Sequence, residues 1–327
     1  MQKLIIKGKR KLSGIIKISG SKNATLPILA AAILSKHTKL TNAPFVKDIF
    51  TMLDLLKFIG LKVLIDKKNK VIEIINKKET INTLAPYQLV KTMRAGVLVL
   101  GSLLTKYKKA KVSLPGGCAI GTRPVDIHLF ALKKLGAKIK IKDGYIIAEA
   151  KKGLNGAKIK FPSISVGATE NALLAAFGAQ GKTELFNCAL EPEILDLIKF
   201  LKKIGSKITI SGRRITIQKK KYVQKVINHK VIFDRIEAGT YLLAGALIGK
   251  KIIINGIETK IFKSEIEILK KMGVKISSSK NFITVKKADN LKKIYISTKP
   301  YPGFPTDLQA QLMVLMTQAN GLSKIKE

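Results

Sequence analysis

A short motif recurs four times along the chain and constrains its fold more than any other feature. Each copy reads leucine, lysine, any residue, an apolar residue, glycine, any residue, lysine and an aliphatic residue, with its glycine at position 60, 136, 205 or 273. The copies therefore recur with a period of roughly 70 residues. Helical spacing precedes each glycine and strand-like alternation follows it, so each copy predicts a helix end followed by a β-hairpin. The clearest hairpin spans residues 139–147, with Asp143 and Gly144 at its turn.

A second helix, rich in small residues, precedes each copy of the motif. Small side chains allow helices to pack closely together. One repeat therefore reads strand, helix, strand, helix, strand, strand, and its amphipathic helices need neighbouring repeats to bury their apolar faces. The sequence predicts an α/β chain built from these βαβαββ units. The small-residue helices are expected at residues 23–35, 95–105, 170–179, 237–249 and 307–319.

The repeat count is uneven, because the chain has five small-residue helices and four closing glycines. From the period, the glycine that would close a fifth unit is expected at about position 341, beyond Glu327. The residues after Gly321 allow one further short strand. On this count we expect a C-terminally truncated chain in which the last unit or units are missing. A fragment, a shortened active enzyme and a degenerate copy all remain open.

The length and composition favour two soluble domains. A chain of 327 residues with 46% hydrophobic content is too long for one ordinary core. No apolar run reaches the roughly 18 residues of a membrane span, and residues 1–12 alternate lysines with aliphatic side chains, unlike a signal peptide. We therefore expect a cytoplasmic protein without a membrane partner. Cys118 and Cys188 are too few for a disulfide framework, so both are expected to be reduced thiols.

The net charge of +40, from 61 basic and 21 acidic residues, raises the question of a nucleic-acid partner. The lysines are spread along the whole chain in pairs and triplets, and no basic stripe is interleaved with aromatic residues. We therefore interpret most of them as a solvated surface and expect no nucleic acid. A basic nucleic-acid-associated protein is retained as an alternative.

A glycine-rich loop at residues 115–126 carries the strongest chemical signal in the chain. Its three glycines and two prolines predict irregular structure that displays Cys118. An isolated cysteine is more commonly a small buried apolar residue. Here Arg123 lies in the same loop, and nearby positive charge stabilises a thiolate. The loop therefore predicts a thiol that acts as a proton donor or a nucleophile on an anionic substrate.

Six collinear segments, spread over the whole chain, carry recognisable motifs. They are residues 19–24, 91–95, 115–128, 165–169, 234–240 and 304–311. Each segment alone is a weak signal, but their common order and consistent spacing are highly specific. Together they resemble the UDP-N-acetylglucosamine enolpyruvyl transferase family of peptidoglycan synthesis.

The resemblance implies a fold and its division into domains. The family's fold is a two-domain inverse α/β barrel, in which each domain has three βαβαββ units. A double crossover joins the two domains, and the active site lies in the cleft. By resemblance, residues 22–229 form the first domain with its three units. Residues 1–21 combine with residues 230–327 to form a second, incomplete domain.

The resemblance also implies a transferase reaction. The enolpyruvyl group of phosphoenolpyruvate moves to the 3'-hydroxyl of UDP-N-acetylglucosamine and phosphate is released, in the first committed step of peptidoglycan synthesis and hence of cell-wall biogenesis, cell shape and cell division. Cys118 matches the general acid that protonates the methylene carbon. Asp307 matches the group that accepts or orients the sugar hydroxyl proton, although it can also be a helix N-cap. Lys22 and Arg123 complete the catalytic set, and neither a cofactor nor a metal is expected.

Both substrates are anionic, so their sites are expected to be cationic and preorganised. By resemblance, Lys22, Arg94 and Arg123 meet the charges of phosphoenolpyruvate. Asn23 and Glu237 match residues that contact the sugar or catalytic neighbours, and each can instead cap the helix that it begins. By resemblance, residues 124–127 lie beside the uridine, and residues 165–167 offer backbone donors near the diphosphate at a helix start. The histidine can equally be a packed residue. The other matched residues are thus Pro124, Val125, Asp126, Ile127, His128, Ser165, Val166, Gly167 and Asp234.

Two positions depart from the family pattern, and both remove a cation. Leu190 stands where arginine is usual, and Ser163 stands where lysine is common. Three hypotheses therefore remain open: an enolpyruvyl transferase, a degenerate truncated relative that binds the UDP-sugar without turnover, and the basic nucleic-acid-associated protein. The retained thiol and motifs favour the first. The sequence gives no indication of the oligomeric state.

Overall fold

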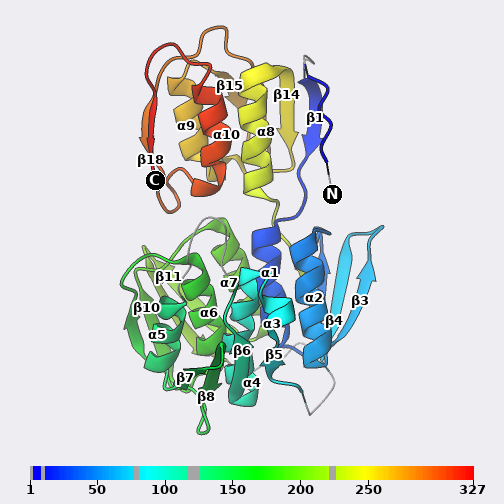
Figure 1. Ribbon diagram of the computed structural model, residues 1–327, viewed down its shortest axis with the longest axis vertical. Coiled ribbons are helices and arrows are strands. Elements are labelled where there is room, and N and C mark those ends of the chain that lie inside the picture. The colour runs from blue at the N-terminus through cyan, green and yellow to red at the C-terminus, as the bar shows by residue number, and fades with distance from the viewer. Residues whose placement is uncertain (1–2, 9–11, 77–80, 117–124, 221–225) are drawn as a thin grey trace. The chain divides into compact units, whose positions relative to one another are not determined.

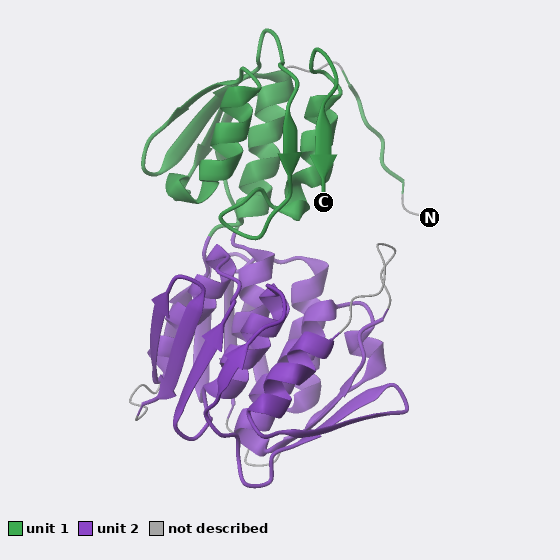
Figure 2. Ribbon diagram, turned by 90° about the vertical axis from the view of Figure 1, so that its left-hand side faces the viewer, with its two compact units in different colours: residues 1–19, 233–327 green, residues 20–232 purple. Residues whose placement is uncertain are grey.

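The computed structural model describes residues 3–8, 12–76, 81–116, 125–220 and 226–327. It divides the chain into two compact units (Figure 2), which are considered separately below. The larger unit is Gly20–Ile232, and the smaller unit combines Met1–Ser19 with Phe233–Glu327.

Three four-stranded sheets make up the strands of the larger unit among the described residues (Figure 1). In each sheet the first two strands are parallel and the last two form an antiparallel hairpin, as the predicted βαβαββ unit requires. The first sheet is β13 (Ile227–Lys230), β2 (His37–Thr41), β4 (Val71–Ile75) and β3 (Lys62–Asp66). The second is β5 (Leu84–Ala85), β6 (Lys109–Ser113), β8 (Tyr145–Glu149) and β7 (Lys138–Lys142). The third is β9 (Lys158–Lys160), β10 (Lys182–Phe186), β12 (Arg214–Lys219) and β11 (Ser206–Ser211).

The helices of the larger unit alternate between small-residue and amphipathic types. The small-residue helices α1, α4 and α6 are buried along most of their length, and α4 contacts both α1 and α6, as expected for helices that are apolar on all sides. The amphipathic helices α2, α5 and α7 bury one face and expose lysines on the other. The helices are α1 (Lys22–Ala32), α2 (Lys47–Ile59), α3 (Tyr87–Val90), η1 (Arg94–Leu98), α4 (Val99–Tyr107), α5 (Asp126–Lys134), α6 (Val166–Ala176) and α7 (Pro192–Ile204).

The smaller unit repeats the same pattern. Its four-stranded sheet has the order β1-β14-β16-β15, in which β1 pairs in parallel with β14, and β17 and β18 form a separate parallel pair. Its strands are β1 (Leu12–Lys17), β14 (Gly249–Asn255), β15 (Lys275–Ser278), β16 (Phe282–Lys286), β17 (Tyr295–Ser297) and β18 (Lys324–Lys326). Its helices are α8 (Arg235–Ile248), η2 (Thr259–Phe262), α9 (Lys263–Lys271), η3 (Thr306–Leu308) and α10 (Gln309–Met316).

The four motif glycines adopt the backbone conformation that makes glycine necessary. Gly60, Gly136, Gly205 and Gly273 have φ angles of 115°, 95°, 114° and 89°. A residue with a Cβ rarely adopts this left-handed region, which terminates the preceding helix. The predicted helix ends are therefore confirmed. The predicted hairpin is also confirmed as β7 and β8, with positive φ at both of its turn residues.

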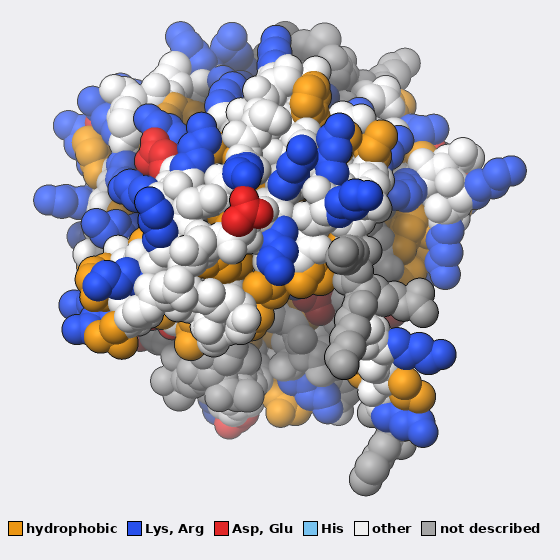
Figure 3. All heavy atoms as spheres, turned by 90° about the horizontal axis from the view of Figure 1, so that it is seen from above, with side chains coloured by type: hydrophobic (Ala, Val, Ile, Leu, Met, Phe, Trp, Pro, Cys, Tyr) orange, Lys and Arg blue, Asp and Glu red, His pale blue; other side chains and the backbone are white. Residues whose placement is uncertain are grey.

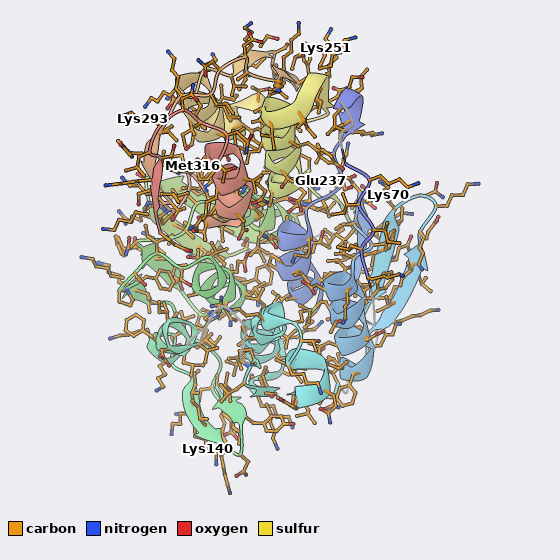
Figure 4. All side chains as sticks on the ribbon, turned by 45° about the horizontal axis from the view of Figure 1, so that its top comes forward. Lys70, Lys140, Glu237, Lys251, Lys293 and Met316 are labelled. Carbon is orange, nitrogen blue, oxygen red and sulfur yellow. The ribbon has the colours of Figure 1, made fainter. Side chains whose placement is uncertain are left out.

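Lysine and arginine side chains are dispersed over the face of the molecule in Figure 3, among uncharged and apolar side chains. Figure 4 labels Lys70, Lys140, Lys251 and Lys293, which are all exposed. This pattern agrees with the interpretation of most lysines as a solvated surface. Within the described residues, no helix has both the length and the apolar character to cross a membrane.

Glu265 is a buried carboxyl in the first turn of α9 and is 4% exposed. Burial raises its pKa to about 7, and the positive charge of Arg235 acts in the opposite direction. The folded chain therefore binds a proton that the unfolded chain releases above its ordinary pKa of 4.5. The contribution of Glu265 to the free energy of unfolding is complete below pH 4.5. It decreases as the pH rises from 4.5 through 7, by roughly 3 kcal/mol in total.

We expect Glu265→Gln to flatten this pH dependence, because the amide stays neutral at every pH. Urea unfolding between pH 5 and pH 8, followed by hydrogen exchange in α9 peptides, measures the effect. Glu267→Gln is the matched control, since Glu267 lies on the same helix and is exposed. An equal pH dependence of unfolding in the wild type and in Glu265→Gln would contradict the expectation.

Candidate functional site

Lys22 and Asn23 are the first two residues of α1 in the larger unit. Ser21 caps this helix, because its Oγ accepts a hydrogen bond from the backbone N–H of Ala24 at 3.2 Å. The alternative role of Asn23 as the helix cap is therefore wrong. The Nζ of Lys22 lies 3.0 Å from Oδ2 of Asp48, and its side chain is 42% exposed. This ion pair fixes a solvent-accessible cation at the start of a buried helix.

Val125 to His128 form the start of α5. Val125 is buried in front of the helix, and Asp126 is its exposed first residue, where a negative charge suits the positive end of the helix dipole. Ile127 is half-buried and His128 is 3% exposed. Burial and, to a smaller extent, the positive charge of Arg94 lower the pKa of His128 to about 4. The imidazole is therefore neutral at pH 7.

The start of α6 lies against this histidine. Ser165 caps the helix through its Oγ, which accepts from the N–H of Ala168 at 3.3 Å. Val166 is 38% exposed. A Cβ placed on Gly167 would lie 3.0 Å from Cε1 and 3.2 Å from Nε2 of His128. The structure therefore brings together His128 and the predicted diphosphate segment, and the exposed Arg94 is near enough to shift the histidine's pKa.

In the smaller unit, Asp234 and Glu237 organise the start of α8. Oδ1 of Asp234 accepts from the N–H groups of Ile236 and Glu237 at 2.9 and 3.0 Å, so Asp234 is the cap. Glu237 (labelled in Figure 4) instead accepts from the N–H of Ser19 at 2.9 Å and from its Oγ at 3.4 Å. The alternative role of Glu237 as a cap is therefore wrong. The carboxylate of Glu237 thus holds Ser19, the first residue of the matched segment 19–24.

Asp307 is exposed in the short helix η3. Neither η3 nor α10 has a side-chain cap, so the alternative cap role of Asp307 is wrong. Its neighbours are anchored to α8. A Cβ on Gly239 would lie 2.4 Å from Leu308 Cδ1, and Gln311 donates a hydrogen bond to Oγ1 of Thr240 at 3.1 Å. The backbone of Asp307 is thus held in place while its carboxylate remains accessible.

Three of the predicted site residues, Cys118, Arg123 and Pro124, lie outside the described residues. The start of their loop is described. A Cβ on Gly116 would lie 2.6 Å from the carbonyl oxygen of Lys91, so the loop begins directly against the second matched segment. The other thiol, Cys188, is fully buried, and burial raises its pKa to about 12. Cys188 is therefore an unreactive core residue.

Comparison with known proteins gives the family. The family model described as EPSP synthase (3-phosphoshikimate 1-carboxyvinyltransferase) matches residues 6–327. The chain is 57% identical over 328 residues to UDP-N-acetylglucosamine 1-carboxyvinyltransferase of Pelagibacter ubique (strain HTCC1062), and covers 78% of that protein. The chain belongs to the UDP-N-acetylglucosamine 1-carboxyvinyltransferase family. The protein of that name from Rickettsia akari (strain Hartford) is 49% identical over 329 residues, with the same 78% coverage. Membership of this 1-carboxyvinyltransferase family confirms the resemblance read from the sequence motifs.

Solved structures confirm the fold of this 1-carboxyvinyltransferase family member. The enolpyruvyl transferase NikO from Streptomyces tendae aligns with a TM-score of 0.83 at 20% identity, covering 97% of this chain and 75% of NikO. EPSP synthase from Acinetobacter baumannii aligns with a TM-score of 0.71 at 18% identity, covering 98% of this chain and 75% of the synthase. At these identities the likeness concerns the fold alone.

The sequence analysis did not identify the buried polar side chains of α6 and α7. Glu170 is 5% exposed; burial raises the pKa of its carboxyl well above the usual range, and Glu193 and Glu191 raise it further. Asn171 is fully buried beside it. The available signal was the run of three polar residues, 169–171, inside a helix that is otherwise made of apolar and small residues. Within the described ranges, no group of three or more His, Cys, Asp or Glu side chains is arranged to hold a metal ion.

Proposed function

We propose that the chain transfers the enolpyruvyl group of phosphoenolpyruvate to the 3'-hydroxyl of UDP-N-acetylglucosamine and releases phosphate. The observation that carries the proposal is 57% identity, over the whole chain, to a protein named for a UDP-N-acetylglucosamine 1-carboxyvinyltransferase. The six matched segments supply the residue types that the chemistry needs. The reaction would be the first committed step of peptidoglycan synthesis, and we assign it to the cytoplasm.

The proposed reaction adds and then eliminates. Cys118 donates a proton to the methylene carbon of phosphoenolpyruvate, and the sugar 3'-oxygen bonds to the adjacent carbon as Asp307 takes the hydroxyl proton. In the second half, the bond from that carbon to the phosphate oxygen breaks and phosphate leaves. The new methyl group returns a proton to the Cys118 thiolate as the double bond re-forms, and the proton held by Asp307 passes to the departing phosphate or to water. The step needs no oxidant, reductant or cofactor.

The described geometry supports separate tasks for the two units. In the larger unit, Lys22 offers a fixed cation for phosphoenolpyruvate, and the start of α6 offers backbone N–H groups for the diphosphate. Asp126 and its neighbours in α5 are assigned to the uridine. In the smaller unit, Asp307 presents an accessible carboxylate, and Asp234 and Glu237 organise the start of α8. We assign the larger unit to the first enolpyruvyl transferase domain and the smaller unit to the second.

Turnover with defined substrates tests the proposal. The purified chain is incubated with phosphoenolpyruvate and UDP-N-acetylglucosamine, and phosphate release is measured together with the enolpyruvyl product by NMR. We expect release that requires both substrates. With 3-phosphoshikimate, the acceptor in the family model's description, we expect none. Binding of the UDP-sugar without phosphate release would favour the degenerate relative, and absence of binding would refute the proposed function.

A further inference from the structure

Helices α4 and α6 cross at Gly101 and Asn171. A Cβ on Gly101 would lie 2.4 Å from Oδ1 of Asn171, so the crossing admits only glycine on α4. The backbone N–H of Gly101 donates to that Oδ1 at 2.8 Å. Because a backbone N–H can only donate, this bond identifies the amide oxygen of Asn171 and therefore also its nitrogen. The orientation of the buried amide is fixed by the helix crossing.

The nitrogen of Asn171 points to two acceptors. Nδ2 donates to the carbonyl oxygen of Val97 at 3.1 Å and lies 3.2 Å from Nδ1 of His128. An amide nitrogen cannot accept a hydrogen bond, so Nδ1 of the histidine has to accept and carries no proton. A neutral imidazole then carries its proton on Nε2. Protonation of both ring nitrogens would place two donors face to face, which agrees with the lowered pKa of this ring.

The Nε2 edge of the ring faces the start of α6. Nε2 lies 3.2 Å from the position of a Cβ on Gly167, and no hydrogen bond joins Nε2 to another described residue. The His128 residue as a whole is only 3% exposed. The N–H groups of the first helical turn have no intrahelical acceptor, and Ser165 Oγ serves the one at Ala168. The Nε2–H edge of this buried ring, unpaired among the described residues, thus faces the positive end of an 11-residue helix.

We propose that Asn171 is a positioning residue that holds His128 in the Nε2–H tautomer, so that this N–H donates to a phosphate oxygen bound at the N-terminal end of α6. The tautomer is independent of the proposed function. The identification of the phosphate as part of the UDP-sugar rests on that function. A histidine that only filled the core would need no particular tautomer, since packing depends on shape alone.

Nitrogen-15 NMR of the free protein tests the tautomer. We expect the His128 Nδ1 signal of a pyridine-like nitrogen and the Nε2 signal of a protonated one, unchanged between pH 5.5 and pH 8. Asn171→Asp should reverse the assignment, because a carboxylate accepts a hydrogen bond from Nδ1–H. A proton on Nδ1 in the wild type would overturn the proposal.

Binding of uridine 5'-diphosphate, measured by calorimetry, tests the donor. His128→Gln places an amide N–H near the former Nε2, so it should bind within about threefold of the wild type, whereas His128→Asn should bind about 10- to 100-fold more weakly. Uridine, which lacks phosphates, should bind both variants equally. His37→Gln and His37→Asn are the matched controls, since His37 lies on the separate strand β2 and pairs with Glu73 of β4.

Equal binding of the diphosphate by His128→Asn and the wild type would overturn the inference while leaving the proposed function intact. If the wild type binds neither the diphosphate nor the UDP-sugar, the proposed function and the phosphate role fail together, and the NMR result still decides the tautomer. The pH dependence of diphosphate binding by Asn171→Asp gives a further test. With its tautomer reversed, this variant should bind the diphosphate more weakly as the pH rises and His128 loses its second proton.

Discussion

Replacement of Cys118 by serine is expected to lower kcat by roughly 10²- to 10⁴-fold, the range of a lost general acid. The hydroxyl has nearly the volume of the thiol but is a much poorer acid, so proton delivery to phosphoenolpyruvate should fail while UDP-N-acetylglucosamine still binds. Steady-state kinetics and calorimetry on the same preparation separate these two effects. The KM for the UDP-sugar should change little.

The second cysteine supplies the control for this result. Cys188 is fully buried with a pKa of about 12, so Cys188→Ala should leave kcat within about twofold. Fosfomycin, an epoxide that resembles phosphoenolpyruvate, should add once to the wild type, at Cys118, and faster with the UDP-sugar present. Peptide mass mapping locates the adduct. An adduct on Cys188, or unchanged kcat in Cys118→Ser, would contradict the assignment.

The repeating unit could be predicted from the sequence because its signals are local. Gly60 and Gly205 end their helices in the left-handed region, and Asp143 with Gly144 forms a tight turn, whatever lies elsewhere in the chain. Each of these conformations depends on a few neighbouring residues. The order of elements inside one unit therefore follows from the pattern alone.

The pairing of distant strands could not be predicted in the same way. The first sheet takes its outer strand from residues 227–230, which pair with residues 38–41, and the sheet of the smaller unit takes β1 from residues 12–17. Short alternating segments such as these fit the edge of any sheet in the chain. Contacts at long sequence separation, and not local propensity, decide which sheet receives each strand.

The motifs indicated the site residues, but three capping alternatives were wrong for one physical reason. Helix α1 begins after Ser21 and α8 begins after Asp234, and these residues take the cap positions that Asn23 and Glu237 would otherwise occupy. Asp307 precedes a helix start that no side chain caps. A cap depends on the residue at which the helix begins, which pattern analysis places only to within a few residues.

The hydrogen bonds made by the polar side chains of α6 could not be predicted from the sequence, for a different reason. The side chain of Asn171 forms hydrogen bonds with Gly101, Val97 and His128, which belong to three other helices. In the sequence it is a single asparagine in a small-residue helix. Its hydrogen-bond partners become identifiable only when the crossing of α4 and α6 is known.

Replacement of Asp307 by asparagine should lower kcat by roughly 10²- to 10⁴-fold, since the amide cannot accept the proton of the sugar hydroxyl. The substitution keeps the shape of the side chain. Because Asp307 is exposed and caps no helix, the thermal unfolding midpoint should stay close to that of the wild type. A lowered kcat with a nearly constant KM for UDP-N-acetylglucosamine would indicate a loss confined to the transition state.

Asp289→Asn is the matched control for Asp307, because Asp289 is an exposed carboxylate of the same unit that pairs with Lys275 at 2.7 Å. It should leave kcat unchanged. The anchoring of Leu308 on Gly239 gives a second check, since Leu308→Ala should loosen η3 and lower both kcat and thermal stability. If Asp307→Asn likewise lost kcat only in proportion to stability, the carboxylate would be a structural group, and its assignment as the proton acceptor would be wrong.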